Sequence, residues 1–426
     1  MEDLPARALL TWRCGQGEGF FMSRHEDRGG RRADYYIAGF IAPTCSALLY
    51  PVLTLFYTKE LGLAPWMVSL FSMLLPVATF LVVQGVGVAS DRGASRPALI
   101  AISLLCGSGA SLLLGSYPPA WALFSLGLLL FAAMGIAFPQ TFASGHEYAV
   151  RYLDDGMMFT TQLRSIASFA WVGAPPVAFF IATALGFRSL YLMCAAFFAL
   201  SAAYSFARLP RVPMIASKDE QAASSGWWRS RKVLLLCLAV MLLFTAFSGY
   251  ISCMPLFIME ELRLPSWAAG AMYGLSAFLE IPLMFIGARI SGRTGLCAQI
   301  ASGGAALLIF LAAMPHFTSP WMFLASSPLP ALFIANCSNM GMILFQRLLP
   351  AIPGQATSLF LNCSTLGQIF AGALFSLSGL GSYAYVFWAC LICCALGLAS
   401  LKGAGITRDD EKPRALHGAV SGSWRD

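Results

Sequence analysis

Long apolar segments recur twelve times along this chain, and they constrain its fold more than any other feature. Each is long enough for a helix of about 20 residues, which spans the roughly 30 Å hydrocarbon core of a bilayer. The composition agrees, because 58% of the residues are hydrophobic and 11% are charged. Soluble domains are about 45–50% apolar and about 25% charged. We expect membrane-spanning helices at 35–57, 66–90, 97–116, 120–143, 158–185, 188–208, 233–258, 267–291, 297–315, 320–345, 356–379 and 382–401.

Lys and Arg are distributed unevenly between the two sides of such a bundle. With twelve spans, both termini and the connections after even-numbered spans share one side, which carries most of the basic residues. The opposite side carries only Lys59, Arg188 and Arg263. Because cytoplasmic connections are enriched in Lys and Arg, we expect both termini in the cytoplasm. The net charge of +7 follows from this topology and requires no nucleic-acid partner.

One polar connection divides the chain into two parts. Residues 209–232 carry seven charged side chains, with Gln, Ser and Gly between them. We therefore expect an all-α polytopic membrane protein with 12 transmembrane helices in two six-helix halves, 35–208 and 233–401, joined by a cytoplasmic linker at 209–232. A cytoplasmic N-terminal arm, 1–34, and a cytoplasmic tail, 402–426, complete this plan.

Two stretches that follow long apolar segments read alike at a constant offset of 201 residues. Tyr57–Trp66 matches Ile258–Trp267, with Glu, two Leu and Trp at equivalent positions. A repeat of this length is too long for a solenoid unit. Parallel halves related by an axis along the membrane normal are the pattern of major facilitator transporters. The repeat therefore indicates the major facilitator fold.

A charged motif lies in the short connection after the second span. It runs from Gly87 to Arg96 and contains Asp91 and Arg92. It resembles the signature loop of the major facilitator superfamily, and the resemblance implies that Asp91 and Arg92 gate the cytoplasmic side. An anion on a short loop can accept hydrogen bonds from a facing helix N-terminus or Arg and later release them. The alternative is a solvated charged turn. At the repeat offset the acid is replaced by Gly292.

A more specific resemblance extends from about residue 40 to residue 380. Its motifs are Pro51-Val-Leu-Thr-Leu-Phe, His146-Glu147-Tyr-Ala, Ala170-Trp171-Val-Gly-Ala-Pro175-Pro176, Met254-Pro255-Leu, Leu279-Glu280-Ile-Pro282, Phe345-Gln346 and Leu361-Asn362. Together they are similar to the sugar efflux transporter family. The resemblance implies a bacterial inner-membrane protein that exports sugars and glycosides. The chain departs from the family pattern at Ala174, Cys253 and Arg347, which stand where that pattern has a glycine and two acids.

Polar side chains inside the spans are the candidates for the site, because a charge at bilayer depth is costly and usually faces a cavity or a partner. Glu280 lies near the middle of the eighth span. It can accept hydrogen bonds from sugar hydroxyls, and it can carry a coupling proton. The alternative for Glu280 is a structural role, paired with a buried cation or amide.

Arg164 lies about two turns into the fifth span, and Ser168 and Trp171 follow at i+4 and i+7. A guanidinium, a hydroxyl and an indole then share one helix face, which suits a sugar with hydroxyl groups and an apolar C–H face. The alternatives are a cytoplasmic gate pair between Arg164 and Glu147, or a side chain that extends toward the headgroups. Glu147 is accordingly a gating candidate.

Three amides complete the predicted binding set: Asn336 and Asn339 in the tenth span and Asn362 in the eleventh. An amide offers donors and acceptors together, which suits the recognition of hydroxyl groups. Amides are also common interhelical contacts in membranes, so a packing role remains the alternative for each.

The sequence favours a monomeric alternating-access exporter of sugars or glycosides that exchanges its cargo against protons. Its partners would be the sugar, the proton and the lipid bilayer, and we expect no cofactor and no metal site. A multidrug/proton antiporter of the same fold is the alternative. A polytopic membrane enzyme is a third possibility, which the four scattered histidines disfavour.

Overall fold

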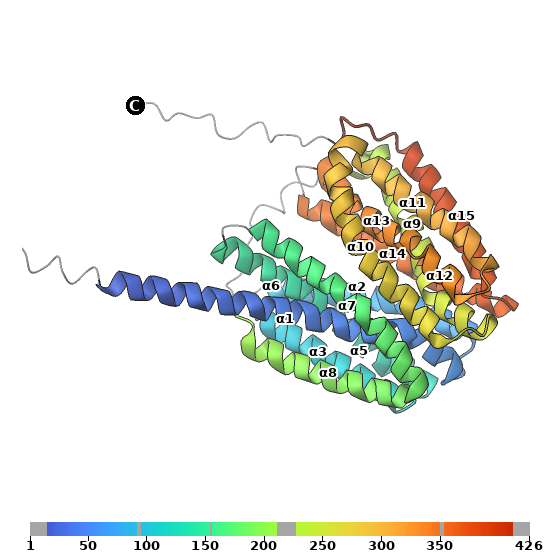
Figure 1. Cartoon of the computed structure of the whole chain (residues 1–426), viewed down its shortest axis with the longest axis horizontal. Helices are drawn as coiled ribbons and strands as arrows, with labels where there is room; N and C mark the ends of the chain where they lie inside the picture. The colour runs from blue at the N-terminus through green and yellow to red at the C-terminus, as the bar shows by residue number, and fades with distance from the viewer. Residues whose placement is uncertain (1–14, 92–94, 154–155, 211–226, 350–352, 412–426) are drawn as a thin grey trace, which may run out of the picture.

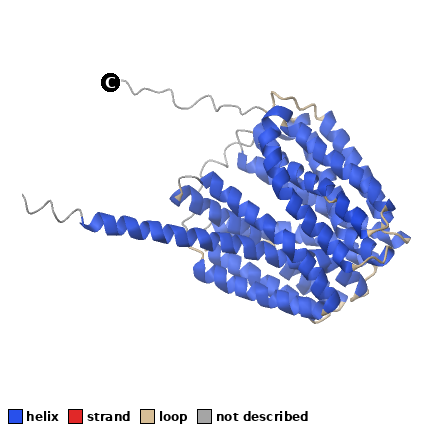
Figure 2. Ribbon diagram, in the orientation of Figure 1, coloured by secondary structure: helices blue, strands red, loops and turns tan. Residues whose placement is uncertain are grey.

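The structure is a computed structural model that describes residues 15–91, 95–153, 156–210, 227–349 and 353–411. The described residues form helices joined by short connections, and they contain no strand (Figure 2). Twelve helical segments of this part are long and apolar enough to cross a membrane. Each overlaps one predicted span, which confirms the all-α class and the number of spans. Their bounds are Arg32–Lys59, Pro65–Val83, Arg96–Gly115, Ala120–Ala149, Gln162–Ala184, Phe187–Arg208, Arg231–Glu261, Ser266–Thr294, Leu296–His316, Pro320–Leu348, Ala356–Leu380 and Ala384–Gly403.

The spans are built from fifteen α-helices and several short π- and 3₁₀-helical turns, all within the described residues. In the first half of the chain the elements are α1 (Gly15–Lys59), α2 (Pro65–Asp91), α3 (Arg96–Gly115), α4 (Ala120–Ala122), η1 (Leu123–Gly127), α5 (Leu128–Met134), α6 (Ala137–Tyr152), α7 (Gly156–Ala184) and α8 (Phe187–Arg208). In the second half they are η2 (Trp227–Arg229), α9 (Arg231–Leu256), η3 (Phe257–Glu261), α10 (Ser266–Thr294), α11 (Leu296–Ala313), η4 (Met314–His316), α12 (Pro320–Ser326), α13 (Pro328–Leu348), α14 (Pro353–Phe375), η5 (Ser376–Leu380) and α15 (Ala384–Gly403).

The helices form two bundles that lie side by side (Figure 1). The first bundle contains α1–α8 and the second contains α9–α15. Packing follows the same order in both: α1 contacts α7 and α8, as α9 contacts α14 and α15, and α3 contacts α6 as α11 contacts α13. Helices α1 and α9, α2 and α10, and α7 and α14 therefore occupy equivalent places. The sequence repeat is a repeat of three-dimensional structure.

The repeated turns after α1 and α9 have the same backbone hydrogen bonds. The amide of Leu61 donates to the carbonyl of Phe56 at 3.1 Å, and that of Leu262 donates to Phe257 at 3.0 Å. Both turns need a residue in the left-handed region, which is Gly62 (φ 59°) in the first half and Arg263 (φ 51°) in the second. A residue with a Cβ pays about 1–2 kcal/mol in this conformation. The second turn is therefore the strained copy.

We predict opposite effects of substitutions at these two equivalent positions. Gly62→Ala should destabilise the protein by about 1 kcal/mol through backbone strain, because an alanine is unfavourable in the left-handed region. A steric clash does not contribute, since no atom lies within 4 Å of the added methyl group. Arg263→Gly should stabilise it by about 0.5 kcal/mol, since relief of strain exceeds the entropy gained by the unfolded chain. Thermal unfolding in detergent measures both. Gly85→Ala, at a helical and equally open position, is the control and should stabilise slightly; a loss of stability there equal to that of Gly62→Ala would contradict the explanation.

The two bundles meet along three helix pairs: α1 with α9, α2 with α14, and α7 with α10. Small residues allow the backbones to touch. A Cβ on Gly274 of α10 would lie 2.4 Å from the carbonyl oxygen of Val172 in α7, and one on Gly372 of α14 would lie 2.7 Å from the backbone of Met73 in α2. The hydroxyl of Ser69 also donates to the carbonyl of Gly372 at 2.6 Å. All these contacts lie toward the membrane face remote from the chain termini, which we call the outer face.

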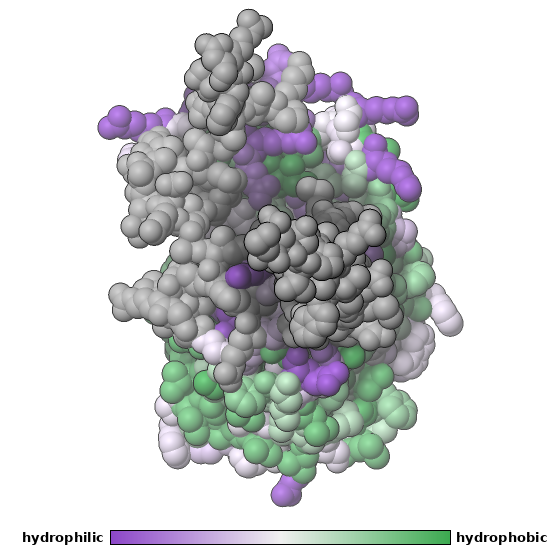
Figure 3. Space-filling model, turned by 90° about the vertical axis from the view of Figure 1, so that its left-hand side faces the viewer, coloured by the Kyte–Doolittle hydropathy of each residue, from purple (hydrophilic) through white to green (hydrophobic). Residues whose placement is uncertain are grey.

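At the opposite face, which we call the termini face, the described polar contacts remain within one bundle. Arg208 pairs with Asp34 in the first bundle at 3.2 Å. Lys232 pairs with Asp410 in the second at 2.7 Å. Figure 3 looks onto this end of the molecule, where hydrophilic side chains gather while apolar side chains cover much of the flanks. In Figure 1 the described helices of the two bundles converge toward the outer face and diverge toward the termini face, so the described conformation is closed at the outer face.

Candidate functional site

Arg164 and Glu280 face one another across the interface of the two bundles. Arg164 lies in α7 and Glu280 in the antiparallel α10, beyond the close contact at Gly274 on the side of the termini face. The charges of the two side chains interact electrostatically, and within the described part of the chain no other charged group acts on either of them. No hydrogen bond to either side chain is present among the described residues. The structure thus brings together the two ionisable residues that the sequence singled out inside the spans.

Both side chains are surrounded by protein and still accessible. Arg164 is exposed and Glu280 is half-buried by accessible surface, while both lose hydration to the protein around them. These two properties are compatible when a side chain lines an internal surface between helices. A ligand can therefore reach both groups, and because they lose hydration their charges interact more strongly than at an open surface.

Trp171 lies two turns further along α7 and is half-buried against the hydrophobic core. Ser168, between Arg164 and Trp171, donates to the carbonyl of Arg164 at 3.4 Å, so its hydroxyl is held on its own helix. The i, i+4, i+7 stripe predicted from the sequence is therefore present on a regular helix. In this stripe Trp171 is half-buried and Arg164 is exposed.

The three candidate amides differ in their surroundings. Asn336 is buried, and its Nδ2 donates to the hydroxyl of Ser302 in α11 at 3.0 Å, so it joins two helices of the second bundle. Asn339 is half-buried and donates to the carbonyl of Ala335 at 3.3 Å. Asn362 is half-buried with no hydrogen bond among the described residues. In this conformation Asn336 packs helices together, whereas Asn339 and Asn362 keep polar atoms accessible.

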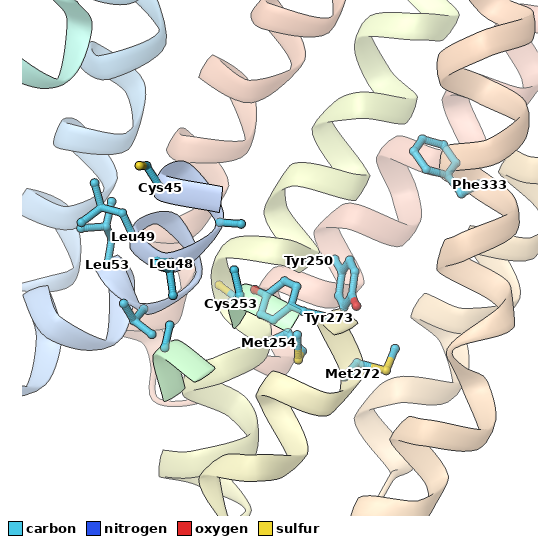
Figure 4. Close-up of a cluster of buried hydrophobic side chains, with 14 of the residues drawn as sticks. Cys45, Leu48, Leu49, Leu53, Tyr250, Cys253, Met254, Met272, Tyr273 and Phe333 are labelled. Carbon is cyan, nitrogen blue, oxygen red and sulfur yellow. The ribbon is translucent and has the colours of Figure 1, made fainter. Parts of the chain in front are cut away.

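A cluster of buried side chains surrounds the position where the family pattern has an acid in the seventh span. Cys253 is fully buried beside Tyr250 and Met254 of α9 and Tyr273 of α10 (Figure 4). The hydroxyl of Tyr273 donates to the carbonyl of Ile251 at 2.5 Å. A fully buried thiol stands at this place, and it offers no carboxylate that could bind and release a proton. Glu280 therefore has no carboxylate counterpart at this position of the seventh span.

Glu147 is buried near the termini face and is held by Arg96. The guanidinium donates to both carboxylate oxygens, at 2.7 and 2.6 Å, and its third bond goes to Gln140 at 2.7 Å. The pairing of Glu147 with Arg164, which the sequence left open, is therefore not the one formed. Arg96 is the last residue of the charged motif, so the motif already contained the partner of Glu147. Asp91 ends α2, and Arg92 lies outside the described residues.

Removal of Arg96 should be costly because it leaves a buried carboxylate without its partner. We predict that Arg96→Ala destabilises the protein by about 3 kcal/mol or more, since an unpaired buried charge carries its full desolvation penalty. The double variant Arg96→Met, Glu147→Leu should recover most of that loss. Thermal unfolding in detergent measures the effect; if the double variant is as unstable as the single one, Glu147 is not the reason for the loss.

The end of the chain supplies a contact that the sequence reasoning missed. Glu411 is buried, and its carboxylate accepts hydrogen bonds from the amides of Leu296 and Cys297, both at 2.8 Å, at the start of α11. An anion is favourable at a helix N-terminus. The guanidinium of Arg347 donates to the carbonyl of Glu411. Arg347, which stands where the family pattern has an acid, thus helps to hold the tail against α11.

Comparison with known proteins identifies the class. The family model of the Major Facilitator Superfamily matches residues 35–372. Among solved structures, the nucleoside transporter NupG superimposes with a TM-score of 0.74 at 15% identity, covering 88% of this chain and 99% of that one. A bacterial homologue of the iron transporter ferroportin in an inward-facing state gives a TM-score of 0.68 at 17% identity, covering 88% of this chain and 98% of that one. The chain has the major facilitator fold and belongs to that superfamily.

Its nearer relatives define the family. Sugar efflux transporter A of Dickeya chrysanthemi is 34% identical over 87% of this chain and 93% of its own length. Sugar efflux transporters A and C of Escherichia coli (strain K12) are 32% and 33% identical, over 83% and 84% of this chain and 91% of each relative. The chain belongs to the sugar efflux transporter family. It is a multi-pass membrane transporter, and the enzyme alternative is thereby excluded.

Proposed function

We propose that this transporter exports sugars or glycosides from the bacterial cytoplasm by alternating access, with protons as the exchanged ion. The observation that carries the proposal is the pair of Arg164 and Glu280 at the junction of the two bundles, accessible and partly dehydrated. The names of the relatives support sugars as the cargo. Substrate sites of such transporters lie near the midplane between the repeats.

The proposed orientation follows from the basic residues. The termini face carries most of the Lys and Arg and would be cytoplasmic, so the outer face would point away from the cytoplasm. The described conformation is then inward-facing, the state in which an exporter loads its cargo. We propose the bacterial inner membrane as its location and a monomer as its functional unit.

The moving bodies would be the halves 35–208 and 233–401, connected by the linker 209–232. Rocking would separate the close contacts of α2 with α14 and of α7 with α10 as the outer face opens, and would bring the opposite ends of these helices together. When the cytoplasmic side closes, Asp91 and Arg92 would bridge the halves, and the buried pair of Glu147 with Arg96 would keep α3 and α6 fixed behind them. Residues 1–34 and 402–426 would remain cytoplasmic.

At the site, Arg164 would donate hydrogen bonds to sugar hydroxyls and Glu280 would accept them. Trp171 would contact the C–H face of the ring, and the accessible amides of Asn339 and Asn362 would add donors and acceptors. Asn336 would act indirectly, because it ties α13 to α11. Glu280 would also carry the proton: sugar and proton compete for the same carboxylate, which couples their opposite movements.

Replacement of Glu280 should separate transport from coupling. In everted vesicles with radiolabelled galactosides, Glu280→Gln should abolish the response of sugar uptake to an imposed proton gradient while sugar–sugar exchange continues, because the amide still forms hydrogen bonds but cannot titrate. Asp409→Asn, at an exposed position of the tail, is the matched control and should behave as the parent. A full response to the gradient in Glu280→Gln would place the coupling elsewhere. Transport of a lipophilic dye with no sugar transport would favour the multidrug antiporter.

Arg164 should contribute mainly to affinity. A hydrogen bond to a charged group is worth about 1.5–3 kcal/mol, so Arg164→Gln should raise the KM for sugar by about 10-fold or more. Arg164→Lys should recover part of the lost affinity, because lysine keeps the positive charge opposite Glu280 but lacks the planar set of donors of a guanidinium. Initial rates across a range of sugar concentrations measure both. An unchanged KM in Arg164→Gln would remove Arg164 from the binding site.

A further inference from the structure

One ion pair joins the two bundles among the described residues. The Nζ atom of Lys59 lies 2.6 Å from Oε2 of Glu260, with side chains that are 53% and 25% exposed. Lys59 is the last residue of α1, and Glu260 lies in η3, the π-helical turn that follows α9. The other described salt bridges each remain within one bundle. The pair therefore spans the closed outer face.

Lys59 and Glu260 are equivalent positions of the repeat, since they are separated by the same 201 residues. Two equivalent residues can touch only where they approach the pseudo-two-fold axis that relates the halves. Identical charges at such a place would face one another and repel. This chain has opposite charges there, whereas the next position has Glu in both halves, Glu60 and Glu261. Of these two neighbouring charged positions, only the one whose residues meet differs in charge between the halves.

The neighbouring acid of the second half has a different role. Glu261 accepts hydrogen bonds from the hydroxyl of Ser382 at 2.6 Å and the amide of Tyr383 at 2.8 Å, at the start of α15. It therefore fastens η3 to its own bundle. This leaves Glu260 as the acid of the turn that reaches the other bundle. The hydrogen bond from Ser266 to Thr183, at 3.2 Å, closes the same face nearby.

We propose that Lys59 and Glu260 form the latch of the outer gate: the pair forms when the outer face is closed and separates when that face opens. Because it joins the two bundles at the outer ends of α1 and η3, rocking that opens the outer face must pull it apart. Its strength then sets the balance between the two conformations. This inference rests on the proposed alternating access, but it does not depend on which cargo is carried.

Charge reversal tests the latch without a transport assay. Ser69→Cys serves as the reporter, because Ser69 is buried against Gly372 at the closed face. In purified protein in detergent, alkylation of this cysteine by a polar maleimide, read by peptide mass spectrometry, reports opening of the outer face. Lys59→Glu should speed alkylation about 3- to 10-fold, since a partly exposed pair is weak and its replacement by two like charges is repulsive.

The swapped variant, Lys59→Glu with Glu260→Lys, should return the rate to that of the parent. Arg188→Glu, an exposed cation on the same face, should leave it unchanged. Equal rates in Lys59→Glu and parent, or a swapped variant as fast as the single one, would overturn the latch. Size-exclusion chromatography shows whether each variant is folded. Glu260→Gln, which removes one charge without introducing repulsion, should give a smaller increase in the alkylation rate than Lys59→Glu.

Cross-linking gives an independent readout. In the double variant Lys59→Cys, Glu260→Cys, a cross-link made by a short bifunctional thiol reagent should stop export. When the linker is cleavable, cutting it should restore export. Export that continues after complete cross-linking would overturn the latch. If the accessibility results hold while no sugar moves in any variant, the gate stands and the proposed cargo fails.

Discussion

The close approach of helix backbones at the outer face is the constraint on which the rest of the structure depends. At Gly274 and Gly372 the bundles touch backbone to backbone, with no room for a Cβ. Without a hydrophobic driving force between helices in lipid, such packing is what holds spans together. Because contact is made at one end of the helices, their other ends can diverge, and the accessible surface at Arg164 and Glu280 follows from that divergence.

The two interfaces are equivalent by symmetry, but their chemistry differs. At the repeat offset Arg164 corresponds to Thr365 and Glu280 to Thr79, so the charged residues of α7 and α10 have threonines at the equivalent positions of α14 and α2. A repeated scaffold supplies two similar surfaces, and one of them holds the ionisable pair. A charge is costly at this depth, which explains why a single pair is placed where it is accessible.

The sequence predicted the spans, their number, the repeat and the family, because hydropathy and motif order depend on the chain alone. It did not predict which side chains pair. Arg96 rather than Arg164 pairs with Glu147, and Asn336 donates a hydrogen bond to Ser302. Such partners depend on how each helix is rotated about its axis and how far it is tilted, which are set by packing. The contact of Glu411 with α11 joins residues over a hundred positions apart, and no local pattern indicates it.

The places where the repeat is broken are those where polar contacts are specialised. The first half binds the start of α3 to α6 through Arg96 and Glu147, but the equivalent positions in the second half are Cys297 and Leu348. There the tail supplies the acid, and Glu411 holds the start of α11 from outside the repeat. The same end of each bundle is therefore fastened by different means, one inside the repeat and one appended to it. A repeated scaffold therefore carries different polar contacts at equivalent places in its two halves.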